Sequence, residues 1–395
     1  MLLIFVLIMQ QKIFIIFIAC IFQITPCLCK AQDTALINLL LKRIAVQQIQ
    51  SDDFFLQGIF PSYISKHENF SSRKKDNNIF FNGLIAYTLH DIKPYVTLQH
   101  QQLIDSIRSN AKSLFAKFKN TKGRDTYNFW RTDSAYDYPY SGLLKPFAKN
   151  ISLPDDMDDT VLSLLALNAD DSTAKIMHTL MQQFVNNDSN KVRSIIQEYD
   201  RLQAYSTWFG KKFPVVFDVS VLCNVLAFVQ FYDLPWTKAD SASLEVIVKT
   251  IENNYHFSKA VYASPYYPKT SLILYHIARL MQIKPISELE ALKIKIISDA
   301  AKELALTKNV LEKIILSSTI LKLGYEPPAI NISANDIEKQ IEQNDFCFFV
   351  GNVPSYFKDF SRAFATANNI GFFYHYCPAY NDALLLEYLV LKHQK

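Results

Sequence analysis

The chain has 395 residues, of which 50% are hydrophobic and 20% charged, a composition that excludes intrinsic disorder and supplies apolar material for a large core. The formal net charge of +4 is too balanced for a nucleic-acid binder. Only 8 glycines are present, which disfavours a turn-rich β-sandwich and any glycine-dependent phosphate loop.

Residues 1–31 are expected to be a secretory signal peptide rather than part of the fold. Lys12 precedes an unbroken apolar run at 13–22, and the small-residue cleavage site follows at 29–31. This run is shorter than the ~20 residues that span a bilayer, which favours cleavage over the alternative of a retained membrane anchor. The sequence therefore predicts a secreted or periplasmic protein with no transmembrane segment after signal cleavage.

Three cysteines remain in the mature part, at Cys223, Cys347 and Cys377. Cys223 lies in the apolar segment 219–231 and is expected in the core. At most one disulfide can form among three cysteines, and Cys347 and Cys377 are the plausible pair in an oxidising compartment. No zinc-ligand spacing accompanies them.

Helical periodicity dominates the mature part, because apolar residues recur at three- and four-residue steps between capping and turn residues. The expected helices are 35–48, 83–89, 98–118, 160–167, 173–185, 219–231, 242–253, 271–281, 289–304, 310–323, 334–343 and 383–392. A short strand is expected at 346–350, near the C-terminus. Aromatic clusters interrupt the helical pattern at 127–130, 136–140, 262–267 and 372–376.

No linker or low-complexity tract divides these helices, so residues 32–395 are expected to form one domain. About twelve helices in hairpins predict an all-α fold, a single (α/α)6 toroid in which six inner helices ring a central funnel. A helical-repeat solenoid is the alternative, although no repeat period is visible.

The most informative stretch carries four aspartates within five residues, at Asp155, Asp156, Asp158 and Asp159. Carboxylates this close repel one another unless protons, cations or hydrogen-bond donors relieve them. The structural interpretation is helix capping, for which one or two aspartates suffice. The functional interpretation is a general acid, because neighbouring carboxylates can keep one member protonated near neutral pH beside an apolar, aromatic cavity.

The segment Asp156-Met157-Asp158-Asp159-Thr160 resembles the D-x-D-D-T signature of class II terpene cyclases of the squalene–hopene cyclase type. The resemblance implies an α/α toroid and proton-initiated cyclisation or isomerisation of an apolar, polyisoprenoid-type substrate. Carried over by position, Asp158 is the general acid, and Asp156 and Asp159 set its protonation. The chain departs from triterpene cyclases in having 3 tryptophans, no Gln/Trp/Gly repeats and helices for one toroid instead of two.

Four further residues are candidates for binding the substrate: Trp130, Trp208, Tyr266 and His375. Aromatic π faces stabilise cations. His375 lies within an aromatic cluster, from which it is placed to hydrogen-bond the acid. The structural alternative for all four is an ordinary place in the core.

The acidic segment also fits a second signature, D-D-x-x-D, which resembles the magnesium site of class I prenyl-diphosphate enzymes. Asp155, Asp156 and Asp159 would then hold Mg²⁺, which prefers carboxylate oxygens. Those enzymes need a second metal motif that this chain lacks, so the expectation is that no cofactor is used.

Two other function classes stay open. A glycosidase or polysaccharide lyase would need two separated carboxylates and aromatic rings on which sugars stack. The candidates are one aspartate of 155–159 with Asp133, Asp137 or Asp218, and the rings of Trp130, Tyr138, Trp208 or Tyr266. The third class is a non-catalytic binding or scaffold protein that keeps the acidic motif for structural reasons.

Overall fold

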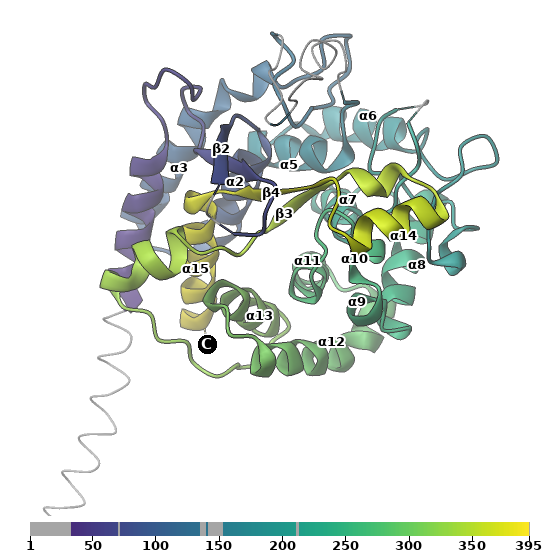
Figure 1. The fold of residues 1–395 in the computed structure, drawn as a ribbon. Helices are drawn as coiled ribbons and strands as arrows, with labels where there is room; N and C mark the ends of the chain where they lie inside the picture. The colour runs from purple at the N-terminus through teal and green to yellow at the C-terminus, as the bar shows by residue number, and fades with distance from the viewer. Residues whose placement is uncertain (1–32, 70–71, 135–139, 141–152, 211–212, 395) are drawn as a thin grey trace, which may run out of the picture.

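A computed structural model describes residues 33–69, 72–134, 140, 153–210 and 213–394 (Figure 1). The expected signal peptide at 1–31 lies outside these residues, as do Asp137 and Tyr138. The described part is mostly helical and carries a small antiparallel sheet of four strands. None of the helices in this part is long and apolar enough to cross a membrane.

Among the described residues, six helices are buried along most of their length. They are α2 (Phe80–Ile92), α5 (Met157–Leu167), α7 (Val219–Phe231), α11 (Thr270–Ile283), α13 (Val310–Lys322) and α15 (Pro378–His393). Each packs against the next in chain order, and α15 packs back against α2, so their contacts form a closed cycle. Their sequences are apolar on nearly every side, as expected for helices enclosed by other elements.

Amphipathic helices lie at the periphery and cover the buried ones (Figure 1). They include a helix at 33–47, α3 (Leu98–Lys112), α6 (Asp171–Met181), α8 (Lys238–Glu252) and α12 (Ser287–Leu306). In α3 the buried side chains are His100, Ile104, Ile107 and Ala111, which recur at three- and four-residue steps and form one stripe. Peripheral and buried helices alternate along much of the chain.

Shorter elements complete the helical part. They are several 3-10 turns, α9 (Tyr255–Ser258), α10 (Ala260–Ala263), α14 (Asp359–Ala367) and a π-helix at Ile337–Glu342, labelled η7. The π-helix replaces the regular helix predicted at 334–343, and it packs against α15.

The sheet joins the beginning of the fold to its end, in the strand order β2-β1-β4-β3. Its strands are β1 (Ser62–Ser65), β2 (Arg73–Asp76), β3 (Phe349–Asn352) and β4 (Phe372–Tyr376). All neighbours are antiparallel; Tyr63 pairs with Tyr376, and Phe349 pairs with His375. Strands β3 and β4 extend across the bundle over one end of the helices (Figure 1).

The prediction of a mostly helical protein is confirmed, and the structure adds a small sheet of four strands where the sequence indicated one short strand. The strand predicted at 346–350 exists as β3, displaced to Phe349–Asn352. The cluster at 372–376 forms β4, as its aromatic residues favour. Strand β2 was not predicted, because its sequence is charged rather than apolar. Arg73, Lys74 and Lys75 are exposed on this edge strand, where lysines block pairing with a further strand.

The disulfide that the sequence allows between Cys347 and Cys377 does not form in this structure, where Cys223, Cys347 and Cys377 are all free and buried. The Cys347 thiol instead donates to two carbonyl oxygens, of Phe349 at 2.8 Å and of His375 at 3.3 Å. Burial raises the pKa of Cys347 to about 12, which keeps the group a neutral thiol. Cys223 lies in the core, as its apolar surroundings predict.

Candidate active site

The acidic segment forms the start of α5 and is held by backbone bonds to two other segments. Asp156 is the N-cap: its extended backbone lets Oδ1 accept from the Asp159 N–H at 2.7 Å. The Asp156 N–H donates to the Tyr127 carbonyl at 3.3 Å, and the Met157 N–H donates to the Thr207 carbonyl at 2.8 Å. The predicted capping role is therefore filled by Asp156.

Asp155 serves the structure of the neighbouring loop. Its Oδ2 accepts from Asn120 Nδ2 at 2.5 Å and from Thr126 Oγ1 at 2.6 Å. Asn128 Nδ2 approaches its Oδ1 at 3.4 Å. These donors relieve the charge of Asp155 and tie the segment before α5 to the loop at 120–128.

Asp158 is buried between two hydrogen-bond donors, one on α7 and one just before α11. Asn224 Nδ2, on α7, donates to its Oδ1 at 2.7 Å, and the Tyr267 hydroxyl, just before α11, donates to its Oδ2. Burial raises the pKa of Asp158, while these hydrogen bonds and the charge of Arg279 act in the opposite direction. Both carboxylate oxygens of Asp158 are thus occupied by donors that favour its ionised form.

Asp156 and Asp159 form a coupled pair of carboxyl groups. Burial raises the pKa of Asp156 to about 7, with a further contribution from the charge of Asp158. Burial, and then the charge of Asp156, raise the pKa of Asp159 well above its ordinary value. Within the described part of the chain, Asp159 Oδ1 is buried without a hydrogen-bond partner. The pair therefore holds at least one proton near neutral pH.

A cavity of about 70 Å³ opens beside these aspartates. It lies where α2, α5 and α7 begin, and β3 and β4 cover it, because residues of all five elements line it. The residues that the cyclase hypothesis names all meet here: Asp156, Asp158, Asp159, Trp130, Trp208, Tyr266 and His375.

The polar atoms of the tryptophans are bonded to other side chains. Trp208 Nε1 donates to the Tyr266 hydroxyl at 3.1 Å, and Trp130 Nε1 donates to Asp76 Oδ1 at 3.0 Å. His375 Nδ1 lies 3.6 Å from Asp76 Oδ2, so its nearest carboxylate is Asp76 rather than the acidic segment. The sequence suggested that His375 hydrogen-bonds the acid, but the carboxylate that it approaches is that of Asp76.

Sequence reasoning missed several other lining residues, namely Phe80, Phe129, Phe349, Gly351 and Tyr356. The ring of Phe349 is nearly parallel to those of Phe129 and Tyr266, with centroids 5.4 and 6.2 Å away. The sequence reasoning also missed Asn224 and Tyr267, the hydrogen-bond partners of Asp158. A signal for Asn224 was present, since it is an amide in the middle of the mostly apolar run 219–231.

The other carboxylates considered for glycan cleavage are used differently. Asp218 caps α7 and accepts from Ser264 Oγ at 2.6 Å and from the Tyr266 N–H at 2.7 Å. Asp133 pairs with Arg131, whose Nε lies 2.7 Å from its Oδ1. Neither lines the cavity, so among the described residues the acids there all come from the start of α5.

A magnesium site at Asp155, Asp156 and Asp159 finds no support in the arrangement of their side chains. Asp155 faces the loop at 120–128, whereas Asp156 and Asp159 face each other. No group of three or more His, Cys, Asp or Glu side chains in the described ranges is placed to hold a metal ion.

Comparison with known proteins gives no relative: no family model matches the chain, and neither a curated protein nor a solved structure matches it.

Proposed function

We propose that the protein is an enzyme of the class II terpene cyclase type, which protonates a carbon–carbon double bond of an apolar, polyisoprenoid-type substrate. The observation that carries this proposal is the buried pair Asp156 and Asp159, whose pKa values are raised by burial and by mutual charge, beside an aromatic cavity. The proposed fold is an (α/α)6 toroid. The closed cycle of contacts among six buried helices, with amphipathic helices outside, supports it.

Within this site we assign the proton donor to Asp159 rather than to Asp158, the residue implied by the resemblance. Both oxygens of Asp158 already accept hydrogen bonds, which favours a carboxylate. Asp159 Oδ1 has no partner among the described residues, and the charge of Asp156 helps to keep Asp159 protonated. Asp158 then supplies negative charge next to the cation that forms.

The proposed step is balanced without a co-reactant. The O–H bond of Asp159 breaks as a new C–H bond forms on one alkene carbon, which leaves a carboxylate and a carbocation on the other carbon. The rings of Phe349, Trp208 and Tyr266 face the cation and stabilise it through their π electrons. Attack by a second double bond closes a ring and moves the cation to another carbon. Loss of a proton from a carbon next to the cation, with Asp159 carboxylate as the acceptor, then forms the final double bond and restores the acid.

The size of the cavity limits what part of a substrate reaches the acid. At about 70 Å³ it is smaller than the ~150 Å³ engineered cavity that binds benzene. It is therefore too small for a whole polyisoprenoid chain, so only the end of such a chain can reach the acid. We expect the substrate to enter end first, with its terminal double bond at Asp159.

The experiment is incubation of the purified protein in D₂O with squalene, farnesol and geranylgeraniol, followed by mass spectrometry. Proton-initiated chemistry places one solvent deuteron on a carbon of the product. We expect this label with the wild type and with Asp133→Asn, which changes a surface ion pair, but not with Asp159→Asn. No labelled product from any probe, or unchanged labelling with Asp159→Asn, contradicts the proposal.

The protonation of the pair can be measured without a substrate. The infrared difference spectrum between wild type and Asp159→Asn at pH 7 should contain the C=O band of a protonated carboxylic acid. A spectrum with only carboxylate bands means that the acidic segment is ionised and serves capping alone. The protein would then be better described as a non-catalytic binding or scaffold protein.

A further inference from the structure

We propose that the connection between β3 and β4 binds the surface of a lipid membrane (Figure 1). The connection consists of a 3-10 turn, η8 (Val353–Tyr356), the helix α14 and the residues that lead from α14 into β4. Its exposed large apolar side chains form what we call the apolar patch: Val353, Phe357, Phe360, Phe364 and Ile370. Gathered apolar surface that remains exposed marks an interaction site.

The side chains of the apolar patch lie close together. The rings of Phe360 and Phe364 are stacked, with centroids 6.3 Å apart. A backbone hydrogen bond of 3.0 Å joins Val353 to the residue after Ile370, which brings the two ends of the connection side by side. Phe357 lies between η8 and α14. The patch is therefore one surface, unlike apolar residues that are exposed singly.

Helix α14 is oriented with its most apolar face outward. Phe360, Phe364 and Ala367 recur at four- and three-residue steps and are all exposed, Phe360 by 81% and Phe364 by 54%. Arg362 lies on the opposite face and is only 3% exposed, and its Nη1 donates to the Arg193 carbonyl at 2.6 Å. A helix that packs only against its own protein has the reverse arrangement, with charge outside and phenylalanine inside. The outward face of α14 therefore calls for an apolar environment.

Basic residues beside the patch favour a lipid surface as that environment. The segment 353–371 contains two basic residues, Lys358 and Arg362, and one acid, Asp359. Lys358 is exposed at the start of α14, and Arg193 is exposed where its Nη1 donates to the Tyr356 carbonyl at 2.8 Å. Lysine and arginine near an anionic lipid surface strengthen binding to it. Phenylalanines on one face with basic residues at its edge are typical of segments that lie in a membrane interface.

The apolar patch adjoins the aspartate cavity. Gly351 in β3 and Tyr356 in η8 line that cavity, so the connection that carries the patch also forms part of the cavity wall. The route of the substrate rests on the proposed function, in which the substrate is apolar and dissolves in lipid rather than in water. A protein docked through the patch would hold its cavity next to the membrane that contains such a substrate.

The test is co-sedimentation of the protein with vesicles of phosphatidylcholine alone and of phosphatidylcholine mixed with phosphatidylglycerol. An exporting host supplies the protein, so that the expected signal peptide at 1–31 is removed. We expect binding to both kinds of vesicle and tighter binding to the mixed, anionic kind, a preference that high salt should remove. Phe360→Ser/Phe364→Ser changes two exposed side chains, so it should fold normally and bind at least tenfold more weakly.

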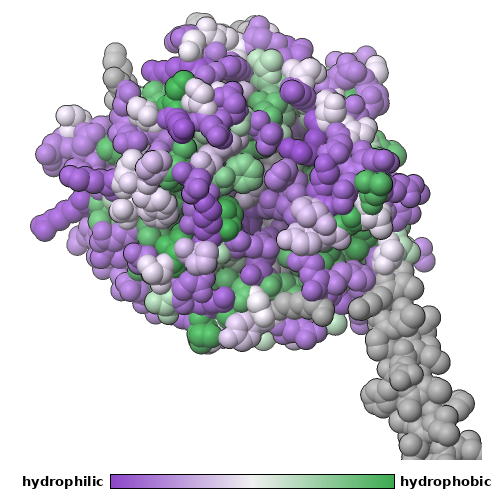
Figure 2. Space-filling view, turned by 180° about the vertical axis from the view of Figure 1, so that it is seen from behind, coloured by the Kyte–Doolittle hydropathy of each residue, from purple (hydrophilic) through white to green (hydrophobic). Residues whose placement is uncertain are grey.

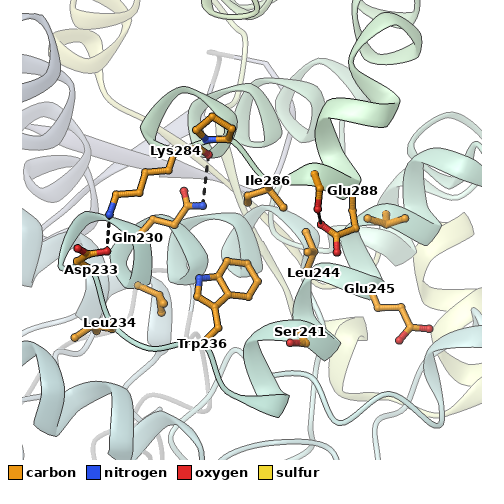
Figure 3. Close-up of a pocket in the computed structure, with 14 residues that line it drawn as sticks. Gln230, Asp233, Leu234, Trp236, Ser241, Leu244, Glu245, Lys284, Ile286 and Glu288 are labelled. Atoms are coloured by element: carbon orange, nitrogen blue, oxygen red, sulfur yellow. Dashed lines mark hydrogen bonds and ion pairs between the residues drawn. The ribbon is translucent and has the colours of Figure 1, made fainter.

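Trp236→Ala is the matched control. Trp236 is also an exposed aromatic residue, but it lies in a groove between the end of α7, the start of α8 and the connection from α11 to α12 (Figure 3). Gln230 in that groove and Val221 at the aspartate cavity lie in the last and first turns of α7, so the groove is away from the cavity that the patch adjoins. Trp236→Ala should bind vesicles as the wild type does.

Asp159→Asn should also bind vesicles normally, which separates docking from the proposed catalysis. Normal vesicle binding by a wild type that yields no deuterium-labelled product would contradict the proposed function and leave the docking in place.

Insertion of the patch is measured with Phe360→Trp and vesicles of brominated phosphatidylcholine. Bromine on the acyl chains quenches nearby tryptophans, so this variant should lose more fluorescence on binding than the wild type with its 3 tryptophans. The inference is overturned if the wild type binds no vesicles, if Phe360→Ser/Phe364→Ser binds as well as the wild type, or if the added tryptophan is not quenched. A dimer in sedimentation velocity that this double substitution abolishes, without vesicle binding, would assign the patch to a second copy of the chain instead.

Discussion

Asp156 and Asp159 differ in what their carboxyl groups do. The Asp156 carboxyl accepts a hydrogen bond as the helix cap, whereas burial and the charge of Asp156 favour the protonated form of Asp159. Their raised pKa values have a consequence for stability. In the unfolded chain an aspartate titrates near pH ~4, whereas in the folded protein the pKa of Asp156 is about 7. Between these values the folded state binds more protons, so the free energy of unfolding falls as pH rises.

We therefore predict that the wild type loses stability between pH 5 and pH 8, by up to ~1.4 kcal/mol per pH unit for each proton involved. Asp159→Asn removes one member of the pair and should show a smaller loss. Urea unfolding at the two pH values measures the difference. Asp133→Asn should behave as the wild type does, since Arg131 lowers the pKa of Asp133 and it is ionised at both pH values. Equal losses in all three proteins would contradict the assignment of the proton to the pair.

At the scale of single residues the sequence was a good guide to the cavity. The aspartates and Trp130, Trp208, Tyr266 and His375 were chosen for their chemistry, and they meet in one place. Their individual contacts were not predictable, because they depend on the packing of segments far apart in the chain. Tyr267 shows this dependence: the sequence does not distinguish it from its neighbour Tyr266, yet only Tyr267 donates a hydrogen bond to Asp158.

Among the helices, the crossing of α2 and α5 can be probed by a single substitution. A Cβ atom placed on Gly83 would lie 3.1 Å from the Cβ of Leu162. Alanine favours a helix over glycine by ~1 kcal/mol, but overpacking a buried contact costs ~1–3 kcal/mol. We expect Gly83→Ala to destabilise the protein by about 1 kcal/mol in chemical denaturation.

Gly351→Ala is the matched control for this substitution. A Cβ on Gly351 would lie 3.4 Å from Phe373 Cβ and 3.6 Å from His375 Nε2, which are ordinary van der Waals distances. This variant should be nearly as stable as the wild type. A stabilised Gly83→Ala would mean that α2 and α5 separate easily and that helix propensity dominates.

Helices were the most predictable elements, because their apolar periodicity is local and survives in any tertiary context. The prediction of 219–231 coincides with α7, and 310–323 exceeds α13 by a single residue. Strands were less predictable, because each holds only four or five residues and gains its hydrogen bonds from a distant partner. Strand β1 pairs with β4, more than 300 residues later, as in Tyr63 with Tyr376.

In the whole molecule the first and last elements are joined at several points. Besides the pairing of β1 with β4, Arg43 forms an ion pair with Glu342 at 2.6 Å, and Lys392 lies 2.9 Å from Asp33. Helix α15 completes the cycle by packing against both α13 and α2. The surface seen from behind is mostly hydrophilic, with scattered apolar residues (Figure 2).

A buried ion pair between Lys322 and Glu387 joins α13 to α15, two neighbouring helices of the cycle. Lys322 on α13 lies 2.8 Å from Glu387 on α15, and both side chains are only 1% exposed. The Tyr275 hydroxyl on α11 donates to Glu387 at 2.7 Å. Lys322→Met leaves this carboxylate buried without its cation, and we expect a loss of ~3–5 kcal/mol in the free energy of unfolding.

The double variant Lys322→Met/Glu387→Gln removes both charges and keeps an acceptor for Tyr275, so it should recover much of that loss. Denaturant titrations of the single and double variants provide the comparison. A double variant no more stable than Lys322→Met would show that the loss comes from packing rather than from the unpaired charge.

The three buried, unbonded thiols mean that no covalent cross-link between cysteines in the described part contributes to the native state. The contacts among the described residues therefore form without a bond between these three cysteines. Because each thiol is enclosed by packed side chains, the rate at which a thiol reagent modifies the protein reports how often the core opens.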